Sequence, residues 1–472
     1  MRKRITGIIF LATILLLTGC RKSEDKLLDP EKPITVTVWH YYNGNTKESF
    51  DTLVSEFNET IGMEKGIVID AQSQGDVSQL ATAVFDAANE SIGAAPMPDI
   101  FASYPDNAFR VNQIVPLISL DQYFNKDELD SYRKEFLEEG KFITDGLYYI
   151  VPIAKSSENL YVNKTQWNSF ASANGFTQED LATWEGIFNV AETYFETTGK
   201  SFFSIDANAN YMMIVSMQLG NEIFSYTEDG RAKFELSEEA AKKIWNYYYI
   251  PYIRQYYLKT GRFSSDDAKT GSILAYTGST AGAAYFPTVI ETENGGEEQI
   301  EPLILPYPHF KDGKAISIQQ GAGMCITKSD EAHQYASSVF LKWFTEPEQN
   351  LKFAVSTGYF PVKKDALNEE LILEQVTQQG ITTESIIESI KASSIMFSNY
   401  TLYNSKPFLY SYEMRDLLER HLFDKIVNDL DQIQQVSENE KETLITELTS
   451  EQAFASWYQD LYQEAQQILD QK

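Results

Sequence analysis

Segments with strand character and segments with helix character alternate along the first part of this chain, and this order constrains its fold more than any other feature. Residues 34–39 and 67–70 are short apolar runs rich in β-branched side chains, a pattern typical of buried strands. The segment between them carries apolar residues at helical spacing, and Thr46 is placed to cap it. Its predicted apolar face consists of Phe50, Leu53, Val54 and Phe57. The alternation predicts parallel strands joined by helices.

The same order continues downstream. Residues 77–89 show helical spacing, and residues 98–101 form another short strand pattern. We therefore expect an α/β protein in which helices cover a parallel sheet. Ligands of such sheets bind beyond the carboxyl ends of the strands, which are here the loops after Trp39, near residues 74–76 and at residues 103–106.

Length and charge narrow the possible functions. The chain has 472 residues, which is more than one hydrophobic core accommodates and suits two or three domains. Its formal net charge is −29. This surplus of carboxylates argues against nucleic acid or anionic lipid as a partner, because both require clustered Lys and Arg. The sequence contains no glycine-rich loop of the kind that cradles phosphates, and we expect no cofactor.

The N-terminus has the pattern of a secretion signal. The basic start MRKR precedes an apolar run over residues 8–17. This run is shorter than the roughly 20 residues that a membrane-spanning helix needs. The remaining alternatives are a plain signal peptide that happens to contain a cysteine and a short membrane anchor.

The end of this segment favours a lipoprotein. Residues 16–20, LLTGC, resemble the lipobox of bacterial lipoproteins, in which the cysteine receives a diacylglyceryl group. We expect a signal peptide over residues 1–19, and a lipidated Cys20 with a flexible tether over residues 20–33. The acyl chains would hold the folded body at the extracytoplasmic face of the bacterial cell membrane.

Catalytic and metal-binding patterns are weak. Cys325 lies in an apolar string and is expected in the core. The histidines show no i, i+4 pairing, so we expect no metal site. The segment GSTAG at residues 278–282 imitates a nucleophile elbow, but its centre is Thr280 rather than serine. We expect no enzymatic activity, and a lipid-anchored glycosidase using two of the many carboxylates is the rival of another class.

Six short motifs occur in a characteristic order. They are WH at 39–40, PDI at 98–100, KSSENLYVNK at 155–164, GSTAG at 278–282, GAG at 321–323 and TGYFP at 357–361. As an ordered set they resemble the family 1 extracellular solute-binding proteins, the lipoprotein receptors of ATP-driven importers that usually carry sugars. The resemblance runs from about residue 34 to the C-terminus and is strongest to the glycerol-3-phosphate-binding component.

The resemblance implies a two-lobed α/β fold of the periplasmic-binding-protein type (type II), with a ligand cleft between lobes that close at a hinge. It also implies a monomer that delivers its solute to permease subunits. The expected division is 34–151 plus 303–358 for lobe 1 and 152–302 plus 359–472 for lobe 2. Chain crossings between the lobes are expected near 149–154, 300–305 and 359–361.

Several ligand-binding positions transfer through this resemblance. Ser157 and Thr280 match ligand-binding positions, and Gly321 matches a backbone contact. Tyr359 matches a binding tyrosine, and Arg415 matches the arginine that helps hold the phosphate.

The chain departs from the glycerol-3-phosphate-binding component at other positions. Asp76 stands where that component has a tyrosine, and Pro105, next to Asp106, stands where it has a glutamate. Asn210 and Tyr211 lie near the place of its second-lobe tryptophans. The complete set of expected ligand-binding residues is Tyr42, Asp76, Tyr104, Asp106, Ser157, Asn210, Tyr211, Thr280, Gly321, Tyr359 and Arg415.

This mixture of residue types suits a carbohydrate-type solute, an oligosaccharide or a polyol. Aromatic rings stack on sugar faces, while carboxylates, amides and hydroxyls bind the ligand hydroxyls. Arg415 would add a fork for phosphate, so glycerol 3-phosphate or a glycerophosphodiester is the alternative solute. A solvated salt bridge is the alternative role for Arg415, since Glu413, Asp416 and Glu419 are nearby. An adhesive or structural surface lipoprotein without a small ligand remains a further alternative.

Overall fold

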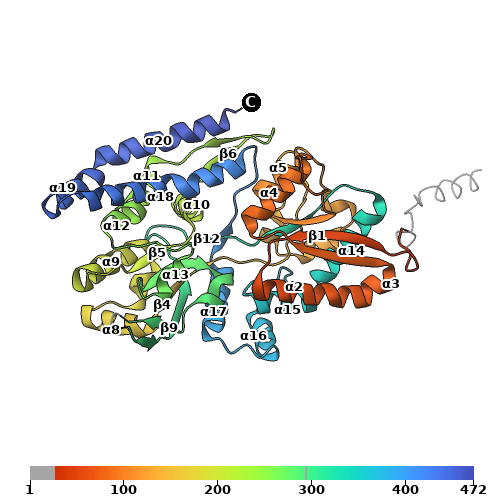
Figure 1. Ribbon diagram of the computed structural model, residues 1–472, viewed down its shortest axis with the longest axis horizontal. Coiled ribbons are helices and arrows are strands. Elements are labelled where there is room, and N and C mark those ends of the chain that lie inside the picture. The colour runs from red at the N-terminus through yellow and green to blue at the C-terminus, as the bar shows by residue number, and fades with distance from the viewer. Residues whose placement is uncertain (1–26, 293–294, 472) are drawn as a thin grey trace, which may run out of the picture.

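The chain folds into two lobes that lie side by side (Figure 1). The computed structural model describes residues 27–292 and 295–471. The predicted signal peptide, the lipidation site Cys20 and the first part of the tether lie outside these residues. The last residues of the expected tether are attached to the first lobe, because Leu28 packs against its hydrophobic core.

The first lobe is built on a four-stranded sheet in the order β13-β3-β1-β2. Its strands are β1 (Ile34–His40), β2 (Ile67–Ser73), β3 (Ile100–Ser103) and β13 (Gly323–Ile326). The pairs β1–β2 and β1–β3 are parallel, as the alternation of strands and helices predicted. Strand β13, which returns late in the chain, is antiparallel to β3 and carries the buried Cys325.

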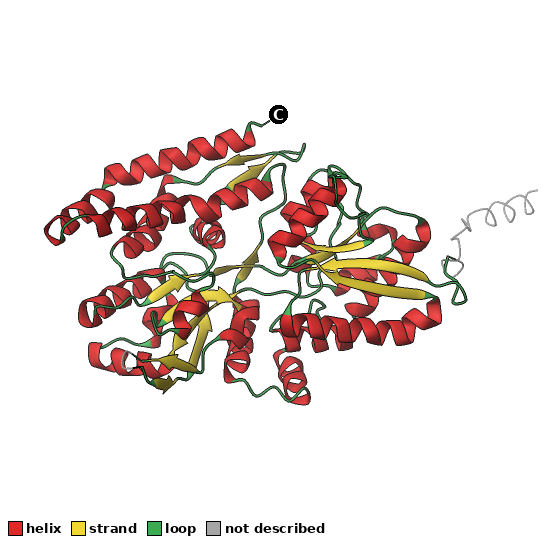
Figure 2. Cartoon of the chain, viewed as in Figure 1, coloured by secondary structure: helices red, strands yellow, loops and turns green. Residues whose placement is uncertain are grey.

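Helices surround this sheet (Figure 2). They are α2 (Gly44–Phe57), α3 (Met63–Lys65), α4 (Val77–Ala88), α5 (Pro105–Asn112), α6 (Lys126–Ser131), α7 (Lys134–Glu138), α14 (Glu331–Phe344) and α15 (Pro347–Thr357), with short turns η2 (Asn58–Gly62) and η3 (Leu120–Gln122). The predicted apolar face of α2 is buried. The helix begins at Gly44 with Asn43 at its N-cap, three residues before the predicted cap at Thr46.

The second lobe is built on a sheet in the order β11-β4-β8-β5. Its strands are β4 (Glu158–Asn163), β5 (Phe203–Ile205), β8 (Ala275–Ser279) and β11 (Pro302–Pro306). Because β11 pairs antiparallel with β4, residues 303–306 lie in the second sheet and not in the first lobe, where the sequence analysis placed them. The hydrophobic core of the second lobe continues to Ile318, so the chain returns to the first lobe only at β13.

Helices and hairpins complete the second lobe and the C-terminal third. The helices are α8 (Lys164–Asn174), α9 (Trp184–Thr198), α10 (Asn208–Gln218), α11 (Glu238–Ile244), α12 (Ile250–Ile253), α13 (Ser264–Lys269), α16 (Glu369–Gln378), α17 (Glu384–Asn399), α18 (Ser411–Gln435), α19 (Glu438–Leu448) and α20 (Glu451–Leu469), and the helical turns are η4 (Gln178–Ala182), η5 (Trp245–Tyr249) and η6 (Thr280–Tyr285). The remaining strands are β6 (Phe224–Tyr226), β7 (Ala232–Phe234), β9 (Val289–Glu291), β10 (Glu297–Gln299), β12 (Ile316–Ile318) and β14 (Thr401–Tyr403). Helices α18 and α20 run along one another on the outside of this lobe (Figure 1).

Three extended segments connect the lobes and pair with one another. Backbone bridges join Lys155 to Phe360 and Ser156 to Gln320. The first and third crossings therefore lie at or next to the positions expected from the sequence. The second crossing lies at residues 319–322 instead of 300–305, because residues 302–306 form β11 inside the second sheet.

Candidate ligand-binding cleft

A cavity of about 790 Å³ lies between the two lobes. On the first lobe, its wall comes from the loops that follow β1, β2 and β3, so it lies at the carboxyl ends of the parallel strands, as expected. On the second lobe, the wall comes from the segment before α13, the turn η6 and helix α18. Tyr359 and Ala322, on or next to the crossing segments, complete it. A solute in this cavity would touch both lobes, which is the condition for ligand-driven closure.

Tyrosines dominate the floor of the cleft. Tyr41 and Tyr359 hydrogen-bond through their hydroxyl groups, and burial raises the pKa of both. Tyr104 is the residue before α5, and its hydroxyl accepts the Gly321 N–H at 3.4 Å. Burial raises the pKa of Tyr104 as well, so these hydroxyls remain protonated donors at neutral pH.

Tyr42 lines the cleft, but most of its ring is buried in the core of the first lobe. It stacks on His40 and contacts Phe50 at ring-centroid distances of 5.2 Å each. His40 Nδ1 accepts the Tyr42 N–H at 3.1 Å, and burial lowers the pKa of this imidazole to about 4. A neutral His40 thus fixes the loop after β1.

Asp76 contributes to the rim of the cleft in two ways. Its carboxylate caps α4 in a reciprocal capping box with Gln79. Its Oδ2 also lies 3.0 Å from Nη2 of Arg262 on the opposite lobe. The Gln79 N–H and then Arg262 hold the pKa of Asp76 below its usual value. Asp76 therefore connects the first lobe to the second.

A second contact between the lobes lies at α5 and α18. The Arg110 guanidinium sits 4.2 Å from the centre of the Tyr412 ring and 4.0 Å from that of Phe85. Its Nη1 is 3.8 Å from the Glu413 carboxylate. Tyr412 also lines the cleft.

Arg415 projects from α18 into the cleft and anchors a chain of polar groups. Its Nη2 donates to Asn210 Oδ1 at 2.7 Å, and Asn210 Nδ2 donates to Glu158 Oε1 at 2.7 Å. Gln320 Nε2 donates to the same Glu158 oxygen at 2.8 Å. Burial raises the pKa of Glu158 to about 8, so this carboxyl is protonated at neutral pH.

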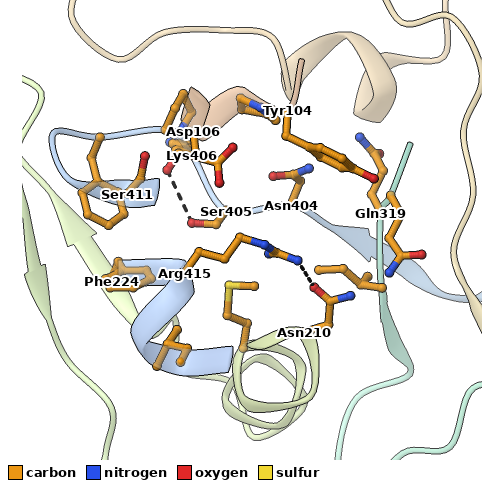
Figure 3. Close-up of a pocket in the computed structure, with 17 residues that line it drawn as sticks. Tyr104, Asp106, Asn210, Phe224, Gln319, Asn404, Ser405, Lys406, Ser411 and Arg415 are labelled. Atoms are coloured by element: carbon orange, nitrogen blue, oxygen red, sulfur yellow. Dashed lines mark hydrogen bonds between the residues drawn. The ribbon is translucent and has the colours of Figure 1, made fainter. Parts of the chain in front are cut away.

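A small side pocket of about 80 Å³ adjoins the cleft (Figure 3). Tyr104, Asp106 and Arg415 line both spaces. The floor of the side pocket includes Asn210, and its far wall is the loop from Asn404 to Phe408.

Four of the expected residues line neither cavity, namely Ser157, Tyr211, Thr280 and Gly321. Tyr211 was expected at the ligand wall, but its ring is fully buried against Trp184, 4.9 Å away between ring centroids. Ser157 is also fully buried, and its Oγ donates to Ile318 O at 2.7 Å. Thr280 Oγ1 accepts the Ser157 N–H at 3.3 Å. Ser157, Tyr211 and Thr280 support the second sheet beneath the cleft instead of facing it.

Gly321 serves the hinge. Its φ is +92°, and a Cβ at this position would lie 2.3 Å from Ala154 O on the first crossing segment. Its carbonyl oxygen accepts a hydrogen bond from Lys155 Nζ, and its N–H donates one to the Tyr104 hydroxyl. The remaining expected residues, namely Tyr42, Asp76, Tyr104, Asp106, Asn210, Tyr359 and Arg415, come together along the cleft and its side pocket.

Sequence reasoning missed several cleft residues. Phe263 and Tyr285 are 51% and 60% exposed, so their rings are free to stack on a solute. Arg262, which pairs with Asp76, is also new. The sequence could have indicated Tyr41, because it lies next to Tyr42 in the loop after the first strand. Asn404 had no local signal, since its position depends on β14 pairing with the distant β12.

Across residues 27–292 and 295–471, no group of three or more His, Cys, Asp or Glu side chains is arranged to hold a metal ion. No helix in those ranges is long and apolar enough to cross a membrane.

A profile of the family described as bacterial extracellular solute-binding protein matches residues 52–379. The chain belongs to this family. No curated protein matches the sequence significantly.

Solved structures share the fold at low sequence identity. The cyclic α-maltosyl-1,6-maltose binding protein of Arthrobacter globiformis has a TM-score of 0.63 and 20% identity, covering 88% of this chain and 100% of that one. UgpB of Mycobacterium tuberculosis, in complex with glycerophosphocholine, has a TM-score of 0.64 and 17% identity, covering 93% and 98%. An ABC substrate-binding protein of Listeria monocytogenes, in complex with cycloalternan, has a TM-score of 0.64 and 14% identity, covering 92% and 99%. Together with the family match, they agree with the two-lobed α/β fold expected from the motifs.

Proposed function

We propose that this protein captures a carbohydrate-type solute, an oligosaccharide or a polyol, and delivers it to the permease of an ATP-driven importer. The observation that carries the proposal is the cavity of about 790 Å³ walled by both lobes. Both aromatic rings and hydrogen-bonding groups line its walls, which is the composition that a polyhydroxylated ring requires. The family consists of solute-binding proteins, and we propose that the chain itself performs no catalysis.

A thermal-shift panel tests this proposal. The panel contains neutral oligosaccharides of two to four units, free polyols, glycerol 3-phosphate and glycerophosphodiesters. A ligand present at 100 times its Kd stabilises the folded state by about 2.7 kcal/mol, so a true ligand raises the melting temperature in a concentration-dependent way. Absence of any shift across the carbohydrate arm contradicts the proposal.

A phosphate-bearing solute is the second candidate, and Arg415 favours it. Within residues 27–292 and 295–471, Arg415 has no carboxylate ion pair, so its remaining N–H groups are available to an anion. If a phosphate binds there, Arg415→Ala abolishes the binding of glycerol phosphates. Retained affinity in this variant rules the candidate out.

We further propose that the receptor is tethered to the extracytoplasmic face of the cell membrane through Cys20 and acts as a monomer. The LLTGC pattern and the family support this location. Cys20→Ser is expected to release the protein into the medium with solute binding intact. Loss of binding in the released protein would contradict the separation of anchor and receptor.

A further inference from the structure

The side pocket contains hydrogen-bonding groups that no other part of the described chain uses. Throughout residues 27–292 and 295–471, the Asn404 side-chain amide forms no hydrogen bond. Asp106 Oδ1 accepts the adjacent Asn107 N–H at 2.8 Å, while Oδ2 has no partner within the same ranges. Arg415 uses only Nη2, on Asn210. Within these ranges, the half-buried Asn404 amide, the half-buried Asp106 Oδ2 and the remaining N–H groups of the exposed Arg415 have no protein partner, so they are free to bind a solute or water.

The size of the pocket limits what enters it. A volume of about 80 Å³ accommodates about five water-sized groups. This is room for a fragment with a few hydroxyls, such as one edge of a sugar ring or a three-carbon polyol. Because Tyr104, Asp106 and Arg415 line both cavities, such a fragment would be the end of a ligand that lies in the cleft.

The charges of the pocket discriminate among end groups. Asp106 repels an anionic end group and so offsets the attraction of Arg415 and Lys406, while these two cations repel a cationic end group. A neutral hydroxyl fits both, since its O–H donates to a carboxylate while its oxygen accepts from a guanidinium. In Figure 3 the Asn404 amide faces the space between the Tyr104 ring and the Arg415 guanidinium. There an amide supplies one donor and one acceptor to neighbouring hydroxyls.

We propose that the side pocket holds the neutral, hydroxyl-bearing end group of the solute, with Asn404 binding its hydroxyls and Asp106 disfavouring an anionic end group. The proposal rests on the carbohydrate-binding function proposed above and names the part of the solute that the pocket recognises. Asn404 is held in place because it directly follows β14, which pairs with β12, and because Tyr403 O accepts the Gln319 N–H at 2.7 Å.

The test is a calorimetric titration with three probes. The first is the neutral oligosaccharide that binds most tightly in the panel. The second is the same oligosaccharide with one terminal unit oxidised to a carboxylic acid, prepared in turn for each end. The third is glycerol 3-phosphate. Wild-type protein is expected to bind the neutral probe at least tenfold more tightly than either acidic probe. Asn404→Ala is expected to lower the affinity for the neutral probe by about ten- to a hundredfold, because the polar groups of the bound end group lose their hydrogen-bond partner. Asn399→Ala is the matched control, because Asn399 is exposed at the end of α17 and lines neither cavity.

Asp106→Asn gives a readout that a purely structural role would not produce. Removing the repelling charge is expected to raise the affinity for the acidic probes relative to the neutral one. The melting temperature without ligand checks that each variant is folded, and the Asp106 result tests the pocket even if Asn404→Ala is unstable. Wild-type preference for an acidic probe, or unchanged neutral affinity in folded Asn404→Ala, overturns the inference and leaves the receptor function standing. No binding of any carbohydrate by the wild type refutes the proposed function itself.

Discussion

Glu158, which lies beneath the cleft, has a pKa well above its ordinary value. It is buried, it receives hydrogen bonds from Asn210 and Gln320, and its Oε2 has no partner within the described residues. Burial is the main cause of its raised pKa, and Asp206 and Glu419 add repulsion while Arg415 opposes it. The folded protein therefore binds one more proton here than the unfolded chain between about pH 4.5 and pH 8.

The sign of this linkage gives a pH prediction. Stability contributed by protonated Glu158 is present below pH 4.5 and is lost as the pH rises towards 8. We expect the unfolding free energy of the wild type, relative to Glu158→Gln, to fall by on the order of 3 kcal/mol between pH 5 and pH 8. Urea denaturation at the two pH values measures it. A difference between the two proteins that does not depend on pH would contradict a raised pKa.

Gly321 permits a second prediction at this scale. A methyl group would collide with Ala154 O at a left-handed backbone position, so Gly321→Ala is expected to lower the unfolding free energy by about 1–3 kcal/mol. Gly282→Ala is the control, since a Cβ there meets no atom within 4 Å, and it should change stability by less than about 0.5 kcal/mol. Equal effects of the two substitutions in urea denaturation would argue against a tight hinge at Gly321.

Some residues of the cleft could be predicted from the sequence, and others could not. Tyr104 and Asp106 were predictable because they directly follow strand β3, and Tyr359 because it lies on a motif with a fixed order. Tyr211 was misplaced because a tyrosine on a helix looks the same whether its ring faces a ligand or a core. The buried contact with Trp184 depends on packing between α9 and α10, which helical spacing alone does not specify.

Among the elements, the first two crossing segments share a buried ion pair with the first lobe. Lys155, on the first crossing, forms a buried ion pair with Glu139, and Gln319 on the second crossing donates to the same carboxylate. Burial lowers the pKa of Lys155. Lys155 Nζ also donates to Gly321 O at 2.5 Å, so one ammonium group joins the first lobe to two crossings.

Breaking this ion pair on one side should be costly. Lys155→Met leaves Glu139 buried without its counter-charge and is expected to lower the unfolding free energy by about 3–5 kcal/mol. The double variant Lys155→Met, Glu139→Leu removes both charges and should recover much of this loss. Urea unfolding of both variants measures it, and a double variant less stable than Lys155→Met would contradict the account.

Elements were predictable where the pattern is local. Strands β1 and β2 and helices α2 and α4 follow from apolar periodicity. The antiparallel edge strand β13 and the position of β11 in the second sheet did not follow, because strand partners separated by more than a hundred residues leave no local signal. For that reason the second crossing was expected about twenty residues too early.

At the scale of the whole molecule, two side-chain contacts bridge the lobes. The Asp76–Arg262 pair and the contact of Arg110 with Tyr412 lie at different places around the cleft. The Asp76–Arg262 pair is largely exposed, so it contributes at most about 1 kcal/mol and is sensitive to salt.

Arg262→Ala is accordingly expected to weaken solute binding by about two- to fivefold at low salt, with a smaller effect at high salt. Arg262 is the residue to change, because replacing Asp76 would also remove the cap of α4. Arg254→Ala is the control, since its ion pair with Glu442 lies within the second lobe. An equal loss of affinity in both variants would argue against a contact that acts between lobes.

We propose that the cleft between the lobes binds one carbohydrate-type solute per chain. Calorimetric titration of the whole protein with the neutral oligosaccharides tests it most directly. The predicted result is one binding site per chain for at least one of them, with affinity lost when Tyr359 or Arg415 is replaced by alanine. Absence of binding heat for every carbohydrate, or binding that survives both substitutions unchanged, would contradict the claim.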